Sequence, residues 1–146
     1  MPEKFVAALA QYRHKDVFNP WGESDPENDI DGQGPIIRRR QLTNYLQERI
    51  GTAKILLLAE AIGYQGGHFS GIPMTSERLL LGGLRHKNIF PDDVFVQTPQ
   101  RTSSPSLKPE GFTEPTATIV WGFFKDAGID PRQAVLWNAF PWHPYV

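Results

Sequence analysis

Two polar stretches, each placed directly after an apolar run, carry residue types that could do chemistry. Residues 59–73 contain a glutamate, Glu60, a histidine, His68, and four glycines, and residues 138–144 begin with Asn138. A carboxylate can orient or deprotonate water, and an amide presents a donor and an acceptor in one plane. Glycines would let a ligand approach the backbone closely. We therefore expect a ligand site that includes Glu60 and Asn138.

The apolar runs before these stretches predict two buried strands, over residues 53–58 and 134–137. Runs this short and this apolar are typical of parallel strands that helices cover on both faces. Ligands bind open parallel sheets at the carboxyl ends of the strands, so both polar stretches should face one crevice. Strands separated by helical crossovers predict a doubly wound α/β layout in a single domain, residues 1–146.

Helices are predicted where apolar spacing and helix-end signals agree. Thr75 or Ser76 can cap the third helix, and Pro115 suits the first turn of the fourth. A short strand is expected at residues 94–96, and residues 97–114 form a long loop of a kind that is usually functional or disordered. The four predicted helices cover residues 2–13, 36–50, 75–84 and 115–127.

Composition limits the classes of protein. The 146 residues include no cysteine, which excludes disulfides and thiolate-held metal clusters and fits a reducing, cytoplasmic location. No apolar run is long enough to span a bilayer, so no membrane partner is expected. The formal net charge of −1 means that nucleic-acid binding would depend on a local basic face. Arg38–Arg40 and Arg85–Lys87 are the two compact basic clusters, and ordinary solvated charge is the simpler interpretation of both.

The first polar stretch resembles a loop of the uracil-DNA glycosylase superfamily. Residues 59–63, AEAIG, are most similar to the GEAPG form of the loop that positions the hydrolytic water, with Glu60 on the glutamate. Ala61 stands where other branches place aspartate or asparagine. Gly63 stands where one branch has a tyrosine that excludes the methyl group of thymine. Residues 71–74, GIPM, are similar to a G-x-P-F run that supplies a ring for stacking on the base.

Other parts of the chain extend the resemblance over roughly residues 53–144. Met74 takes the place of the stacking phenylalanine, and Phe69 is the nearest aromatic residue that could replace it. Residues 134–138, AVLWN, resemble the family's second strand, whose terminal asparagine reads the polar edge of uracil. A proline- and serine-rich segment resembles the family's loop that grips the DNA backbone. Its serines are Ser103, Ser104 and Ser106.

The resemblance implies a three-layer doubly wound parallel sheet and an activity in base-excision repair. The expected reaction is hydrolysis of the N-glycosidic bond of uracil, or of a related deaminated base, in DNA. Glu60 would be the catalytic carboxylate, and His68 would bind DNA together with the three serines. No cofactor is expected, because the four cysteines that hold an iron–sulfur cluster in the GEAPG branch are absent. Substrate binding is assigned to Ala61, Gly63, Phe69, Met74 and Asn138.

The chain resembles only the N-terminal portion of such a glycosylase. The family's later strands and its histidine-bearing loop would follow Pro144, and we do not equate His143 with that histidine. We therefore expect the domain to be truncated after its second core strand. Truncation there would leave an open sheet edge, which favours self-association.

The sequence is also compatible with other functions. A degenerate relative could bind nucleic acid without cleaving it, with Asn138 tying down a turn and Glu60 capping one. A metal-dependent hydrolase could use Glu60, His68 and His143, although no HxH or HExxH spacing supports it. A dinucleotide-binding domain is disfavoured, because the glycines do not follow the G-x-G-x-x-G pattern.

Overall fold

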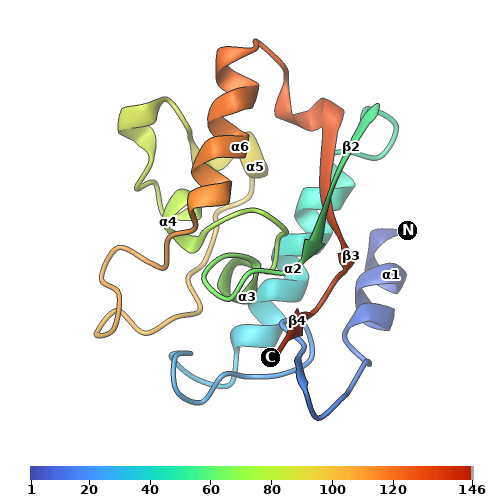
Figure 1. The fold of residues 1–146 in the computed structure, drawn as a ribbon, viewed down its shortest axis with the longest axis vertical. Coiled ribbons are helices and arrows are strands. Elements are labelled where there is room, and N and C mark those ends of the chain that lie inside the picture. Colours follow the sequence, from blue (N-terminus) through green and yellow to red (C-terminus); the bar gives the residue numbers. More distant parts are fainter. Residues whose placement is uncertain (146) are drawn as a thin grey trace.

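Two parallel strands, β2 (Ile55–Ala61) and β3 (Ala134–Phe140), run side by side through the structure (Figure 1). This computed structural model describes residues 1–145. Ala59 pairs with Asn138 across the two strands, and Leu57 pairs with Leu136. The chain therefore has the predicted mixed α/β character, and the parallel sheet formed by the described residues has two strands.

The helices within residues 1–145 differ greatly in length. In Figure 1, α2 lies behind the strand pair and α6 stands beside it, while the short helices α3 to α5 belong to the crossover between the strands. None of these helices is both long and apolar enough to cross a membrane. The bounds are α1 (Pro2–Leu9), α2 (Gly34–Gln47), α3 (Gly67–Ser70), α4 (Glu77–Leu80), α5 (Pro91–Val94) and α6 (Pro115–Asp126), with 3-10 turns η1 (Arg85–Lys87) and η2 (Pro131–Gln133).

Two of the predicted helix starts are confirmed by the local chemistry. Ser76 caps α4, because its Oγ accepts a hydrogen bond from the Leu79 N–H at 3.2 Å. Pro115 occupies the first turn of α6, where its missing N–H costs nothing. Gly128, with a φ of +66°, follows the end of α6 and adopts the left-handed conformation that suits a helix C-terminus.

The short strand predicted at residues 94–96 is wrong. The apolar residues there follow the helix α5, which begins at Pro91. Proline is pre-organised for the first helical position, and the Asp93 carboxylate accepts a hydrogen bond from the Phe90 N–H at 2.8 Å. These two start signals outweigh the β-propensity of the residues that follow.

A second pair of strands joins the N-terminal segment to the end of the chain. β1 (Val17–Phe18) and β4 (His143–Pro144) pair antiparallel, with Phe18 opposite His143. The sequence predicted neither strand, since two-residue strands carry no periodicity. Their pairing holds the segment after α1 beside the residues that follow β3.

The carboxyl end of β3 is fixed by packing against helices. Leu136 is buried together with Tyr45 of α2 and Trp121 of α6. The Leu136 N–H also donates a hydrogen bond to the Tyr45 hydroxyl at 2.7 Å. Because β3 is held in this way, Asn138, two residues further on and two residues before the end of the strand, has a well-defined position.

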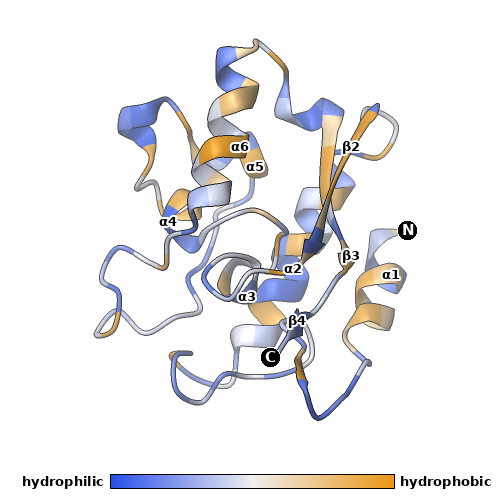
Figure 2. Cartoon of the chain, viewed as in Figure 1, coloured by the Kyte–Doolittle hydropathy of each residue, from blue (hydrophilic) through white to orange (hydrophobic). Residues whose placement is uncertain are grey.

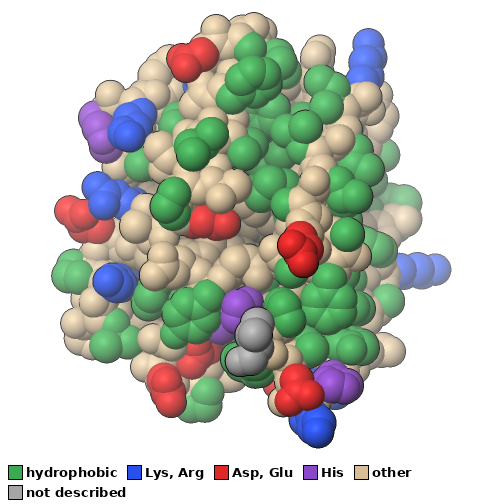
Figure 3. Space-filling model, in the orientation of Figure 1, with side chains coloured by type: hydrophobic (Ala, Val, Ile, Leu, Met, Phe, Trp, Pro, Cys, Tyr) green, Lys and Arg blue, Asp and Glu red, His purple; other side chains and the backbone are tan. Residues whose placement is uncertain are grey.

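The prediction that β2 is buried on both faces is wrong. Leu56 is 62 % exposed and Leu58 is 59 % exposed, whereas Leu57, on the other face, is half-buried. Ile119 and Phe123 of α6 are exposed as well, and Figures 2 and 3 show hydrophobic residues gathered along β2 and α6. Within residues 1–145, no element pairs with the second edge of β2. Self-association at this edge stays a prediction.

Candidate functional site at the ends of strands β2 and β3

The loops that follow β2 and β3 contact each other directly. The Ile62 N–H donates a hydrogen bond to the Trp142 carbonyl at 3.4 Å, and the Ile62 carbonyl accepts one from His143 Nδ1 at 2.9 Å. The prediction that both polar stretches lie at one edge of the sheet is therefore confirmed. A ligand at this edge would meet residues from both stretches.

Asn138 is a buried amide whose polar atoms have no partner. Its exposed fraction is 1 %, and neither Nδ2 nor Oδ1 forms a hydrogen bond within residues 1–145. Burying an unpartnered amide costs about 1–3 kcal/mol, so such groups are rare in folded proteins and each calls for an explanation. By contrast, the equally buried Asn19 donates to two carbonyls, at 2.7 and 3.0 Å, and accepts from the Trp21 N–H at 3.0 Å. Asn138 therefore has an unused donor and an unused acceptor at the end of β3.

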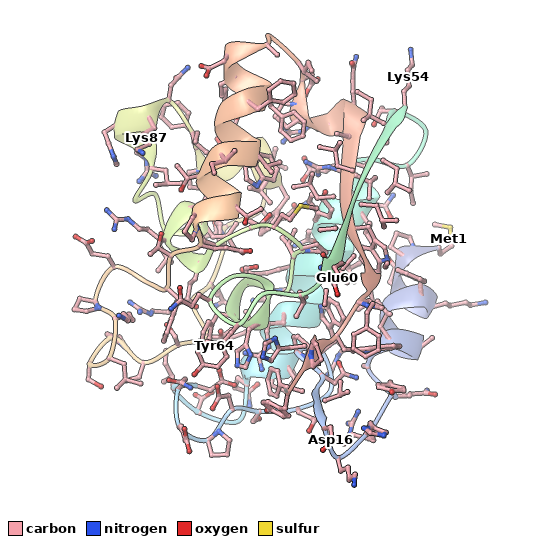
Figure 4. All side chains as sticks on the ribbon, in the orientation of Figure 1. Met1, Asp16, Lys54, Glu60, Tyr64 and Lys87 are labelled. Carbon is pink, nitrogen blue, oxygen red and sulfur yellow. The ribbon has the colours of Figure 1, made fainter. Side chains whose placement is uncertain are left out.

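Glu60 lies on the opposite face of the strand pair from Asn138. Residues paired in register on parallel strands point to the same face, and Ala59 is the partner of Asn138. Successive side chains alternate between faces, so Glu60 points the other way, and it is exposed at the end of β2 (Figure 4). The structure does not bring the two predicted site residues together, and a catalytic role for Glu60 stays a prediction.

A different carboxylate, that of Glu114, packs against the glycines after β2. A Cβ atom added to Gly66 would overlap Glu114 Oε2, and one added to Gly63 would lie 2.9 Å from Oε1. Oε2 is shielded from solvent and has no hydrogen-bond partner within residues 1–145. Burial raises the pKa of the Glu114 carboxyl.

Sequence reasoning missed Glu114. It precedes Pro115 and forms the N-cap position of α6, and no local pattern links it to glycines about fifty residues earlier. The only signal was the pair Gly63 and Gly66, which we assigned to close approach of a ligand. In the structure these two glycines leave room for a carboxylate of the same chain.

The two candidates for stacking on a base are both buried. Phe69 is 0 % exposed, and one face of its ring stacks on Phe112 at a centroid distance of 4.0 Å. Met74 lies in the core, and its carbonyl accepts a hydrogen bond from Trp121 Nε1 at 3.2 Å. Met74 also has a φ of +50°, which is rare for a residue that is not glycine. A base could stack on that face of Phe69 only if Phe112 moved away.

The remaining loop residues assigned to substrate binding, Ala61 and Gly63, are partly exposed at the same strand end. Ala61 pairs with Phe140 of β3. Their small size leaves the approach to the loop backbone open, apart from the Glu114 carboxylate that rests on Gly63. The structure therefore places both residues where the sequence predicted them, at the edge where the two loops meet.

His68 is an uncharged, paired histidine. Its Nε2 lies 2.8 Å from Asp25 Oδ2, and its ring stacks on Phe18 at a centroid distance of 4.0 Å. Burial lowers the pKa of His68 to about 4, so the ring carries no charge at neutral pH. A hollow beside it is lined by Asp25, Glu27, Tyr64 and Tyr145, and Figure 4 shows Tyr64 in the loop after β2. A neutral ring beside two carboxylates is poorly suited to binding phosphate.

The serine loop is anchored by a buried glutamate that the sequence did not single out for this role. Ser103 is 0 % exposed, and both its hydroxyl and its N–H donate to the Glu77 carboxylate. Thr102 N–H donates to the same carboxylate at 2.8 Å. Ser104 and Ser106 remain at the surface, with their hydroxyl oxygens 2.8 Å apart. Only these two serines are therefore placed to reach a DNA backbone.

The residues of the metal-hydrolase alternative do not form a ligand set. His68 Nε2 is bonded to Asp25, and His143 Nδ1 is bonded to a backbone carbonyl. Within residues 1–145, no group of three or more His, Asp or Glu side chains is placed to hold a metal ion. The geometry gives this alternative no support.

Comparisons with protein-family models, with curated proteins and with solved structures found no match. The resemblance of residues 59–63 and 134–138 to the glycosylase motifs stays an expectation.

Proposed function

We propose that the protein is a DNA glycosylase that hydrolyses the N-glycosidic bond of uracil, or of a related deaminated base, in DNA. The observation that carries the proposal is the unpartnered amide of Asn138. Uracil presents a carbonyl and an N–H on adjacent ring atoms, which match the donor and the acceptor of one planar amide. Cytosine presents an unprotonated ring nitrogen where uracil has the N–H, so the same amide orientation rejects it.

The position of Asn138 also suits a base that has left the duplex. Enzymes that act on a base extrude the nucleotide into a pocket and read its polar edge there. Asn138 is 1 % exposed, so a base reaching it is removed from water, and each hydrogen bond becomes more selective. The glycine-containing loop after β2 adjoins this position, because Ala59 is the register partner of Asn138.

The test is cleavage of a labelled oligonucleotide that contains one uracil, with a thymine-containing twin as control and hot alkali to reveal abasic sites. We expect the protein to cleave the uracil strand alone. Asn138→Ala should lower the single-turnover rate by about 100-fold or more, as loss of a hydrogen bond to the reacting group does in other enzymes. Asn44→Ala, on the half-buried flank of α2, is the matched control and should leave the rate unchanged.

The outcomes separate the rival interpretations. Tight binding of the uracil oligonucleotide without cleavage would support the non-catalytic, nucleic-acid-binding alternative. Equal cleavage of the uracil and thymine strands would overturn the proposal, since the Asn138 amide would then not distinguish the two bases.

A further inference from the structure

Glu77 is buried and Glu114 is half-buried with its Oε2 shielded, and the surroundings of the two carboxylates differ sharply. The Glu77 carboxylate accepts hydrogen bonds from the N–H groups of Thr102 and Ser103 and from the Ser103 hydroxyl, so its burial is compensated. Glu114 Oε2 is shielded from solvent and has no such partner within residues 1–145. Glu77 has a clear structural role, whereas the shielded Oε2 of Glu114 accepts no hydrogen bond within residues 1–145 and Glu114 makes no side-chain cap bond to α6.

The contact between Glu114 and the loop depends on two glycines. Any side chain at Gly66 would overlap Glu114 Oε2, and one at Gly63 would crowd Oε1. The loop is therefore shaped so that a carboxylate from the start of α6 lies directly on its backbone. That arrangement places an acid–base group on the loop that follows β2.

Glu114 contacts the loop that follows β2, and Asn138 lies beside the last residues of β2 itself. Asn138 is the register partner of Ala59, and Glu114 contacts Gly63, four residues further along. Four residues of chain span at most about 14 Å when fully extended. The Cα atoms of Ala59, beside the amide, and of Gly63, beside the carboxylate, therefore lie within this distance of each other.

We propose that Glu114, and not Glu60, is the catalytic carboxylate of the glycosylase reaction. This inference rests on the proposed function. As the bond between C1′ and the base nitrogen breaks, its electron pair leaves with the base, and a water oxygen bonds to C1′. Glu114 takes one proton from that water and releases it to the departing base or to solvent, so that the products are the free base and an abasic sugar.

The electrostatics of the site agree with this role. Burial raises the pKa of the Glu114 carboxyl above its ordinary value, and a general base is most effective when its pKa lies near the working pH. A partly shielded carboxylate beside the sugar would also stabilise the positive charge that develops there more strongly than an exposed one. Glu60 is exposed on the other face of the strands from Asn138.

The experiment compares single-turnover cleavage of the uracil oligonucleotide by the wild type, Glu114→Gln and Glu60→Gln. We expect Glu114→Gln to lower the rate by about 100- to 10,000-fold, the usual contribution of a general base, with unchanged binding of the oligonucleotide. Glu60→Gln should cleave at the wild-type rate. The wild-type rate should rise with pH through the titration of Glu114, and this limb should be absent in Glu114→Gln.

A second variant moves the carboxylate without removing it. Gly66→Ala adds a Cβ atom that overlaps the flexible end of Glu114, so the carboxylate must shift. We expect Gly66→Ala alone to slow cleavage. Added to Glu114→Gln, it should slow cleavage no further, because both changes act on the same carboxylate position. Gly32→Ala is the control, since nothing lies within 4 Å of its added Cβ.

A wild type that cleaves, together with an active Glu114→Gln and an inactive Glu60→Gln, would overturn the assignment and leave the glycosylase function standing. A wild type that cleaves no uracil strand would overturn the function, and the role of Glu114 with it. The two failures are therefore distinguishable.

Discussion

Replacing Asn138 by leucine should make the protein more stable while abolishing its activity. Leucine has the same number of side-chain heavy atoms as asparagine and the same branching, so it is the apolar residue that matches the shape of asparagine best. The substitution removes a buried amide that has no hydrogen-bond partner. On the scale derived from protein mutants, that burial costs about 1–3 kcal/mol. We expect the free energy of unfolding to rise by about this amount.

Asn19 provides a matched control with the opposite sign. It is as buried as Asn138, but its amide is bonded to the carbonyls of Leu9 and Tyr12 and to the N–H of Trp21. Asn19→Leu leaves the buried Trp21 N–H without a partner, while the carbonyls of Leu9 and Tyr12 keep their bonds to Trp142 and Arg13. We expect it to lower the free energy of unfolding by about 1–3 kcal/mol, the cost of one lost partner.

Urea unfolding of both variants measures the difference. A higher midpoint for Asn138→Leu and a lower one for Asn19→Leu, at an unchanged slope, would show that stability is given up at Asn138 to keep a binding group in place. If Asn138→Leu lowers the midpoint as Asn19→Leu does, the amide is satisfied in solution. The reasoning that identifies Asn138 as a ligand-reading group would then be refuted.

Two further predictions concern the supports of the site. Glu77→Ala should lower the free energy of unfolding, measured in urea, by about 3–5 kcal/mol, because the buried donors of Thr102 and Ser103 lose their acceptor. Glu110→Ala, at an exposed glutamate, is the control and should change it little. Equal unfolding midpoints for the two variants would contradict the anchoring role of Glu77. Burial lowers the pKa of His68 to about 4 in the folded protein, so the unfolded chain binds the proton more readily. The contribution of neutral His68 to the free energy of unfolding is therefore complete above pH 6.5 and is lost as the pH falls toward 4. Urea titrations at a series of pH values should show that the free energy of unfolding falls by about 3 kcal/mol over this range. If a His68→Gln variant shows the same pH dependence as the wild type, His68 does not cause the fall.

The sequence predicted those elements whose signals are local. Ser76 and Pro115 mark helix starts through hydrogen-bonding and backbone geometry that involve only neighbouring residues. The apolar run before Asn138 predicted the start of β3 at Ala134, although the strand continues through Asn138 to Phe140. These features needed no knowledge of the rest of the chain.

The parts that could not be predicted depend on contacts between distant segments. The exposure of Leu56 depends on whether another element covers β2, which an apolar run does not reveal. The separation of Glu60 from Asn138 depends on the register of two strands, because a shift of one residue exchanges the faces. The contact of Glu114 with Gly66 joins segments that no sequence pattern connects.

The exposed tip of the serine loop offers a way to watch the site. Residues 105–110 lie at the surface, while Phe112, just beyond them, stacks on Phe69. Since the chain has no cysteine, Ser106→Cys would create a unique attachment point for a fluorescent dye. A dye there would change its emission if Phe112 swings away to admit a base, so that entry of the ligand could be timed separately from the chemistry.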